Sequence, residues 1–557
     1  MSFVGDLRRY LAKISLLDCI CVCSIVSFGY AWLSGSTDLY RFWTGFLGHP
    51  YGDMPDHVWG NEWFARCLEQ RRLPWFVEDT YFPDRSILWN IDWLGGIFRF
   101  VFSMVPNHWV WNVWIWFHIS ALGVSVYGVS CWLFAKWDGT LSWSHKLIST
   151  IASVMILSSN YIAGLIHSGL SEYLSVYWLF LLYWAIRSDS RYKWWLCGLL
   201  LAITGMHCFA YGIFGVLLVL FYTEYKQWWK IALLPMCMVL PLLYIVYQST
   251  HHPLSAFTAN QAPGWDFARL PALDVWGYFA IGDFVFPDTR LRNPGILQSH
   301  ALGWSMIFLI VLGLYQSKDW VWKREGILTI LGLGPRLVVC GVGVLPMLPL
   351  GLLYFPYSPF SFLHHPYHIV TMVYVLYLPF LLKGMNSIPK RYIPLLLGLW
   401  CYEKYVDVVE YPFAITSLAE DVVVEGARLD WPPDASTANR RYLLHQTQHH
   451  QPIAMGINRW MSKSVFEDSG VQRWLRLLHD PFERAINRDV PPREPVLLDK
   501  VDLSAPSSLG SLGFRWIVVH REFLRAEEER KIIAQLTREF GEYIQYSDTQ
   551  YVFQIAQ

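Results

Sequence analysis

The sequence predicts an all-α polytopic membrane bundle followed by a soluble C-terminal domain of α/β or α+β type. Of its 557 residues, 54% are hydrophobic and 16% are charged, whereas about 25% of a typical soluble protein is charged. The charge is also uneven: residues 1–403 carry 48 charged residues (12%), and residues 404–557 carry 40 (26%). We therefore expect a transmembrane domain over 1–406 and a water-soluble domain over 407–557.

The charge balance excludes a nucleic-acid binder. Lys and Arg together number 44, as do Asp and Glu, so no basic field attracts a phosphate backbone. The sequence also lacks the Walker A, Rossmann, GxSxG and HExxH patterns, and energy coupling by a bound nucleotide is therefore unsupported.

The bundle is predicted from apolar runs. A spanning helix needs about 20 mostly apolar residues, and roughly eleven segments qualify, several of them short. The split between the fifth and sixth is the least distinct. The segments are 14–33, 108–134, 147–166, 171–186, 194–206, 208–222, 231–248, 300–316, 326–346, 368–382 and 391–406.

The basic residues near these segments predict the topology. With a cytoplasmic N-terminus and eleven spans, each basic cluster falls in a cytoplasmic connection, as the positive-inside rule requires. The clusters are Arg8/Arg9/Lys13, Lys136/Lys146, Arg187/Arg191/Lys193, Lys226/Lys230, Lys318/Lys323/Arg324 and Lys383/Lys390/Arg391. This places a large first loop, 34–107, and the C-terminal domain outside a bacterial inner (cytoplasmic) membrane. In that domain we expect a buried strand at 514–520, a charged helix at about 522–540 and a strand near 550–555.

The richest candidate site is the segment Gly-Asp-Met-Pro-Asp-His at 52–57. Asp53 and Asp56 are predicted to be catalytic, because a carboxylate just outside the membrane can act as a general base or hold a divalent cation. His57 and Glu62 are predicted to contact substrate. The alternative is ordinary capping, since Asp is a favoured N-cap and a helix is expected from Met54 to about Gln70.

A second candidate lies in the short outer connection His-Ser-Gly-Leu-Ser-Glu at 167–172. Ionisable groups at the membrane boundary are costly and commonly functional, so Glu172 is predicted to be catalytic and His167 to contact substrate. The alternative is an interfacial Glu172 that faces headgroup water.

Two further candidates precede late spans. Arg336 lies about ten residues into an apolar run, roughly 15 Å deep, and is predicted to bind a lipid phosphate or a carboxylate. The alternative is that Pro335 begins a shorter helix there. His364, His365 and His368 could bind phosphate or sugar hydroxyls, or could form an interfacial turn. A zinc site at these three is not expected, because Pro366 interrupts the helix.

Several motifs resemble the bacterial GT-C fold membrane glycosyltransferases, in particular their YfhO-like, mannosyltransferase-like branch. The likeness covers most of the chain and rests on the order of individually weak motifs. They are Gly-Asp…His…Trp (52–59), Leu-Glu-Gln-Arg-Arg-Leu-Pro-Trp (68–75), Ser-Gly-Leu-Ser-Glu (168–172), Ala-Leu-Gly-Trp (301–304), Leu-Gly-Leu-Gly-Pro (331–335), Trp-Pro-Pro (431–433), Tyr-Leu-Leu-His-Gln-Thr-Gln-His-His-Gln-Pro-Ile (442–453) and Leu-Gly-Phe-Arg-Trp-Ile-Val-Val-His (512–520).

The resemblance implies a GT-C-like bundle that transfers a hexosyl or pentosyl group from a polyprenyl-phosphate donor to an outer-face glycan, lipid or protein acceptor of the cell envelope. It implies that Asp53 activates the acceptor, with Asp56 beside it. The sequence departs from the family at 364–368, where His-His-Pro-Tyr-His replaces an Arg-x-Pro-x-Arg pattern. Imidazole is mostly neutral at pH 7, so this replacement argues against phosphate binding at that point. A divalent cation, Mg²⁺ or Mn²⁺, is a possible cofactor, and the sequence leaves open whether it is required.

Two other functions compete with glycosyl transfer. A transporter or flippase of lipid-linked sugars predicts ionisable residues along the bundle interior and discontinuous helices at mid-depth. A non-catalytic membrane scaffold predicts that Asp53, Glu172 and Arg336 do not line one cavity. The carboxylates cluster outside the predicted spans, which favours the enzyme.

Overall fold

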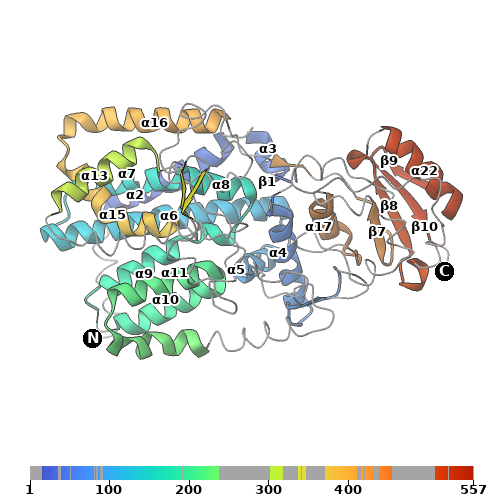
Figure 1. Ribbon diagram of the computed structural model, residues 1–557, viewed down its shortest axis with the longest axis horizontal. Helices are drawn as coiled ribbons and strands as arrows, with labels where there is room; N and C mark the ends of the chain where they lie inside the picture. The colour runs from blue at the N-terminus through green and yellow to red at the C-terminus, as the bar shows by residue number, and fades with distance from the viewer. Residues whose placement is uncertain are drawn as a thin grey trace. The chain divides into compact units, whose positions relative to one another are not determined.

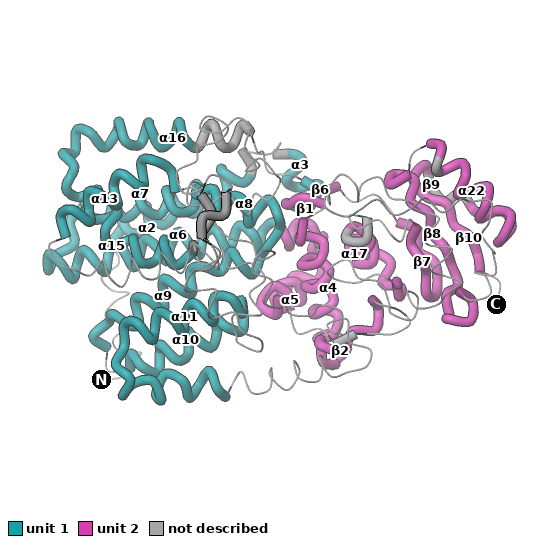
Figure 2. Tube along the Cα trace, in the orientation of Figure 1, with its two compact units in different colours: residues 1–47, 112–240, 262–415 teal, residues 48–111, 241–261, 416–557 magenta. Residues whose placement is uncertain are grey.

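In the computed structural model the chain divides into two compact units, which are drawn in different colours in Figure 2. Unit 1 comprises residues 1–47, 112–240 and 262–415, and unit 2 comprises residues 48–111, 241–261 and 416–557. The structure describes residues 15–35, 39–50, 52–80, 82, 86–87, 92–190, 192–237, 302–317, 337–339, 342–345, 370–410, 415–417, 421–431, 438–454, 509–524 and 526–555.

Unit 1 is mainly helical (Figure 1). Its apolar helices are α2 (Leu16–Gly35), α3 (Leu39–Thr44), α6 (Asn107–Asp138, whose first turn is counted in unit 2), α7 (Trp143–Leu157), α8 (Asn160–Ser168), α9 (Tyr177–Arg187), α10 (Lys193–His207), α11 (Phe209–Tyr222), α13 (Trp304–Gln316), α15 (Val370–Ser387) and α16 (Ile393–Glu410). Residues 225–237 are helical as well. Two 3₁₀ turns, η1 (Glu172–Leu174) and η10 (Lys390–Tyr392), precede α9 and α16.

Two helices of the described chain are long and apolar enough to cross a membrane, Leu16–Leu33 and Asn107–Asp138. A third span results if α7 and α8, which meet at a 46° bend, form one broken helix. The predicted spans at 171–186, 194–206, 208–222, 300–316, 368–382 and 391–406 coincide with helices that fall short of this measure. The total of eleven spans, and the topology derived from it, stay predictions.

The helix predicted over 326–346 is wrong in its second half. Residues Leu337–Val339 (β4) and Val342–Leu345 (β5) pair as antiparallel strands. The short connection includes Gly341, and Val is the commonest residue of both strands, which favours a hairpin over a helix because β-branched side chains fit a pleated backbone. Arg336, just before β4, lies outside the described residues.

Glycines let the helices of unit 1 approach closely. A Cβ atom on Gly313 of α13 would collide with the backbone of Phe380, and one on Gly384 of α15 would collide with the carbonyl of Leu309. Packing of this kind is typical of membrane helices, where small residues replace the hydrophobic driving force. The predicted break between 194–206 and 208–222 is confirmed, because α10 ends at His207 and α11 begins at Phe209.

A partly buried ion pair lies at the start of α2 in unit 1. Lys146 Nζ of α7 lies 2.7 Å from Asp18 Oδ2, and the Tyr127 hydroxyl of α6 donates to Asp18 Oδ1 at 2.8 Å. Asp18 therefore makes contacts internal to the bundle, as polar residues of membrane helices commonly do.

Unit 2 combines the first outer loop with the C-terminal segment. Its loop elements are α4 (Met54–Glu69), β2 (Phe76–Val77), β3 (Ser86–Ile87) and α5 (Trp93–Val101). Its C-terminal elements are β7 (Arg428–Trp431), α17 (Ala438–His449), β8 (Trp516–His520), η13 (Arg521–Phe523), α22 (Ala526–Phe540), β9 (Ile544–Ser547) and β10 (Gln550–Gln554). The short strands β1 (Phe46–Leu47) and β6 (Ile415–Thr416) lie where the chain passes between the units.

Loop and C-terminal segment are joined by polar and aromatic contacts within unit 2. Trp59 of α4 donates through Nε1 to Gln446 Oε1 of α17 at 2.7 Å, and both side chains are buried. The amide of Ile453 donates to the carbonyl of Asp79 at 2.9 Å. The loop was predicted to belong to the N-terminal domain, whereas its residues 48–111 group with residues 416–557 in unit 2.

The sheet of unit 2 has the order β7-β8-β10-β9, with β7 parallel to β8 and the other pairs antiparallel. The strand predicted at 514–520, the charged helix at 522–540 and the strand near 550–555 are present as β8, α22 and β10. Because side chains alternate along a strand, one face of the sheet carries the apolar core with Ile532 and Leu536 of α22. Val518 and Val552 point to the opposite face.

Candidate functional site

The carboxylates of the first outer loop lie at the start of α4. Asp53 occupies the N-cap position, but its side chain makes no capping hydrogen bond to the first turn. Asp56 lies inside that turn, buried to 7% exposure. Pro55 fits here because the first turn needs no intrahelical N–H donor. The N-cap position therefore belongs to Asp53, and Asp56 lies within the helix; the catalytic roles predicted for both stay predictions.

Glu62 is held by an ion pair within unit 2. Arg99 Nε of α5 lies 2.6 Å from Glu62 Oε2 of α4, and both side chains are nearly buried. The two helices are close enough for this because Gly95 and Gly96 of α5 contact α4, where a Cβ would collide with Asn61 and Phe64. Glu62 thus has a structural partner, and its predicted contact with substrate stays a prediction.

His167 and Glu172 flank a tight turn in unit 1. His167 lies in the last turn of α8, which ends at Gly169 with φ 73°, a conformation that favours glycine. Glu172 begins η1 and is buried to 9% exposure. Asp53 and His57 belong to unit 2, so their approach to Glu172 stays a prediction. Arg336, His364, His365 and His368 lie outside the described residues.

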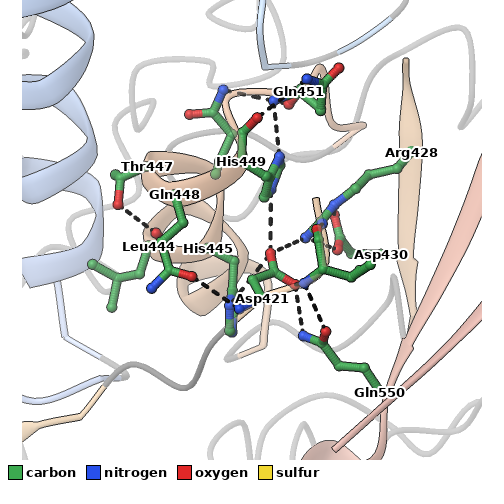
Figure 3. A network of polar contacts seen from close by, with 12 residues as sticks. Asp421, Arg428, Asp430, Leu444, His445, Thr447, Gln448, His449, Gln451 and Gln550 are labelled. Atoms are coloured by element: carbon green, nitrogen blue, oxygen red, sulfur yellow. Dashed lines mark hydrogen bonds and ion pairs between the residues drawn. The ribbon is translucent and has the colours of Figure 1, made fainter. Parts of the chain in front are cut away.

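The densest polar cluster of unit 2 surrounds Arg428, on the sheet face opposite α22. The Arg428 side chain is fully buried, and its Nη2 lies 2.7 Å from Asp421 Oδ2 and 2.8 Å from Asp430 Oδ1. Its Nη1 donates to the carbonyl of Val422 at 3.0 Å. Asp421 also accepts from Gln550 Nε2 at 2.7 Å (Figure 3). Burial favours the neutral acid and is the largest single influence, yet Arg428 and the surrounding histidine rings together hold the pKa of Asp421 well below its usual value.

Two histidines of α17 point at this cluster. His445 and His449 lie four residues apart, so they share one helix face, and each has a ring nitrogen 3.6 Å from Asp421 Oδ2 (Figure 3). Both are almost fully buried. Burial lowers the pKa of each ring well below its usual value, so both are neutral near pH 7.

The cluster continues along β8 into η13. His520 Nε2 lies 2.9 Å from Asp430 Oδ1, and its ring centre lies 5.1 Å from that of His445. Glu522, two residues later, approaches His445 Nε2 with Oε1 at 3.9 Å and accepts from Arg441 Nη2 at 3.2 Å. One ligand atom from each of His445, His520 and Glu522 lies within 4.8 Å of the others.

The cluster of Arg428, Asp430, His445 and His520 was not among the sites predicted from the sequence. Residues 442–453 and 512–520 entered the prediction only as motifs that resemble the glycosyltransferases. The available signals were two histidines spaced i, i+4 and the alternation of Arg428 and Asp430 with apolar Leu429 and Trp431, which indicates a strand with one polar face.

Comparisons with known proteins give a limited result. No protein family matches the sequence, and no curated protein matches it. Among solved structures, the archaeal oligosaccharyltransferase AglB from Archaeoglobus fulgidus, in complex with an inhibitory peptide and a dolichol-phosphate, is similar to this chain with 11% identity and a TM-score of 0.43. That match covers 98% of this chain and 75% of AglB. A likeness this loose assigns neither a fold nor a function.

Proposed function

We propose that this protein is a GT-C-like membrane glycosyltransferase that moves a sugar from a polyprenyl-phosphate donor to an acceptor at the outer face of a bacterial inner membrane. The apolar helices α2 and α6 support a membrane location. A lipid-linked donor has to be met at the bilayer surface, and the carboxylates of α4 lie in the loop that the positive-inside rule assigns to the outer side.

The position of Asp53 at the N-terminus of α4 is the observation that carries the proposal. An Asp at an N-cap normally accepts from the second or third amide of its helix, and the Asp53 side chain does not. The Asp53 side chain is partly buried at the start of α4. A carboxylate of this kind can accept the proton of an acceptor hydroxyl as that oxygen attacks the sugar.

Deletion of the gene provides the test. Cells without the protein should accumulate lipid-linked sugars that mass spectrometry identifies, and a plasmid copy should clear them. A copy with Asp53→Asn should not, whereas a copy with Glu69→Gln, a change at the exposed end of the same helix, should. Unchanged lipid-linked sugars in the deletion strain would overturn the proposal.

The same experiment separates the transporter alternative. If the protein were a flippase, its deletion would leave the lipid-linked sugar on the cytoplasmic face of the membrane, where intact spheroplasts protect it from a membrane-impermeant glycosidase. A transferase leaves it exposed on the outer face. We also propose that the transfer depends on Mg²⁺ or Mn²⁺, so that a chelator should stop it and added metal should restore it.

A further inference from the structure

We propose that His445, His520 and Glu522 of unit 2 form a Zn²⁺ site, with two imidazole ligands, one carboxylate ligand and a water in the fourth position. Nothing in the proposed glycosyl transfer uses these residues, so the inference stands apart from that function. Its support is geometric, and it comes from three helical or strand elements that the fold brings together.

The first argument is the distance between the donor atoms. In a tetrahedral zinc site with bonds of about 2.0–2.2 Å, ligand atoms lie about 3.3 Å apart. His445 Nε2 and Glu522 Oε1 are 3.9 Å apart, and all three ligands offer atoms within 4.8 Å of one another. A shift of about 1 Å in each side chain brings the three donor atoms to the separation that a tetrahedral zinc site needs.

The second argument is the state of His445. Its side chain is 1% exposed, and among the residues that the structure describes neither ring nitrogen has a hydrogen-bond partner. An unsatisfied buried polar group destabilises the folded state, and coordination of a cation by one nitrogen removes part of that cost. Its Nε2 lies 3.9 Å from Glu522 Oε1, and its ring centre lies 5.1 Å from that of His520.

The third argument is the outer shell. Metal-bound histidines commonly donate their second nitrogen to a carboxylate, which orients the ring and strengthens the ligand. Asp430 takes this position toward His520 at 2.9 Å, and Arg428 in turn holds Asp430. The other His520 nitrogen, Nδ1, lies 3.4 Å from Gln550 Nε2, a contact that a metal bound at Nδ1 replaces.

The fourth argument is charge. Within the described cluster the carboxylates of Asp421, Asp430 and Glu522 face the guanidinium groups of Arg428 and Arg441, which leaves one net negative charge in a largely buried place. A cation is favoured there. Two imidazoles and one carboxylate suit Zn²⁺ better than Mg²⁺ or Ca²⁺, which prefer oxygen ligands. The Glu522 side chain is 27% exposed, which gives the ion a route from solvent.

The test uses the full-length protein in detergent, stripped of metal with a chelator and titrated with Zn²⁺ by calorimetry. Co²⁺ added in place of Zn²⁺ reports tetrahedral coordination by its visible absorption. His445→Gln and Glu522→Gln should each weaken Zn²⁺ binding by about tenfold or more and remove the Co²⁺ band. Glu522 lies at the surface, so its variant keeps the test valid if the His445 variant fails to fold.

His449→Gln is the matched control. His449 lies on the same helix, is equally buried and is the same distance from Asp421, but it is not among the proposed ligands. Its variant should bind Zn²⁺ within about twofold of the wild type. The proposal is overturned if the wild type binds no Zn²⁺, if the ligand variants bind as the wild type does, or if the control loses as much affinity as His445→Gln.

Discussion

Replacement of Arg428 by Met tests how the polar face of the sheet in unit 2 is held together. Met keeps most of the length and apolar volume of the side chain but removes its charge and all of its donors. Two buried carboxylates, Asp421 and Asp430, then lose a cation at 2.7 and 2.8 Å, and the carbonyl of Val422 loses a donor at 3.0 Å.

The expected cost follows from these contacts. Removal of one partner from a buried ion pair costs about 3–5 kcal/mol, because the remaining charge is left uncompensated. Arg428 serves two carboxylates, so we expect a value near the upper end of that range, about 4–5 kcal/mol. This corresponds to an increase of about 10³-fold in the population of the opened sheet.

Hydrogen exchange read by mass spectrometry measures this opening directly. Peptides that cover β7 and β8 should exchange about 10³-fold faster in Arg428→Met, while peptides of α13 and α15 in unit 1 should be unchanged. The control is Lys531→Met, which removes an exposed pair with Glu527 and should change exchange by less than about threefold. An acceleration below about fivefold in Arg428→Met, equivalent to about 1 kcal/mol, would refute the reasoning.

Three further predictions concern the other parts of the chain. Asp53→Asn should lower glycosyl transfer by about a hundredfold or more and leave the melting temperature unchanged. Asp56→Asn should lower stability by about 0.3–1 kcal/mol, because it removes a negative charge from the first turn of α4. Transfer assays and thermal melts of both variants test this, and near-normal transfer by Asp53→Asn would reject its role as a base. Gly384→Ala should destabilise the detergent-solubilised protein by about 1–3 kcal/mol, because the added methyl collides with the backbone of α13; Gly128→Ala, whose Cβ meets no described atom within 4 Å, is the control, and equal melting temperatures would contradict the packing. A reporter fused after Gln557 should signal the outer compartment, because eleven spans from a cytoplasmic N-terminus end there; a cytoplasmic signal would show that a span is miscounted.

Local sequence signals predicted much of unit 2. The apolar run at 514–520 forms β8, and the charged segment after it forms α22, because alternation and helical periodicity depend on nearest neighbours in the chain. The start of α4 at Met54 was also correct, since Gly52 and Pro55 mark a turn and a helix N-terminus. In unit 1, the break at Cys208 was visible from a short polar interruption.

The hairpin β4–β5 shows where such signals fail. Hydropathy averages over a window and therefore cannot distinguish a buried strand from a helix when both are apolar. The composition of 326–346 met the hydropathy criterion, yet its Val residues favour the extended backbone over the second half. The strand preference of the Val residues was therefore present in the sequence, but an average hydropathy does not register it.

By itself, the sequence determined that the chain has an apolar helical part and a charged C-terminal part, because composition and periodicity reflect the solvent that each segment meets. It also determined that Asp53 and Asp56 stand at the start of a helix. Only the tertiary structure decided that the first loop folds with the C-terminal segment. That pairing depends on contacts such as Trp59 with Gln446, which are separated by nearly four hundred residues.

The polar cluster around Arg428 has the same origin. Asp421, Asp430, His445 and His520 come from a loop, a strand, a helix and a second strand. The i, i+4 histidines and the alternation around Asp430 each mark one polar face of a single element, but they do not show that these elements meet. A parallel pairing of β7 with β8 sets Asp430 beside the strand that ends at His520, and the helix between them brings His445 to the same face. Chain topology and side-chain burial therefore created this cluster, and no local pattern encodes either of them.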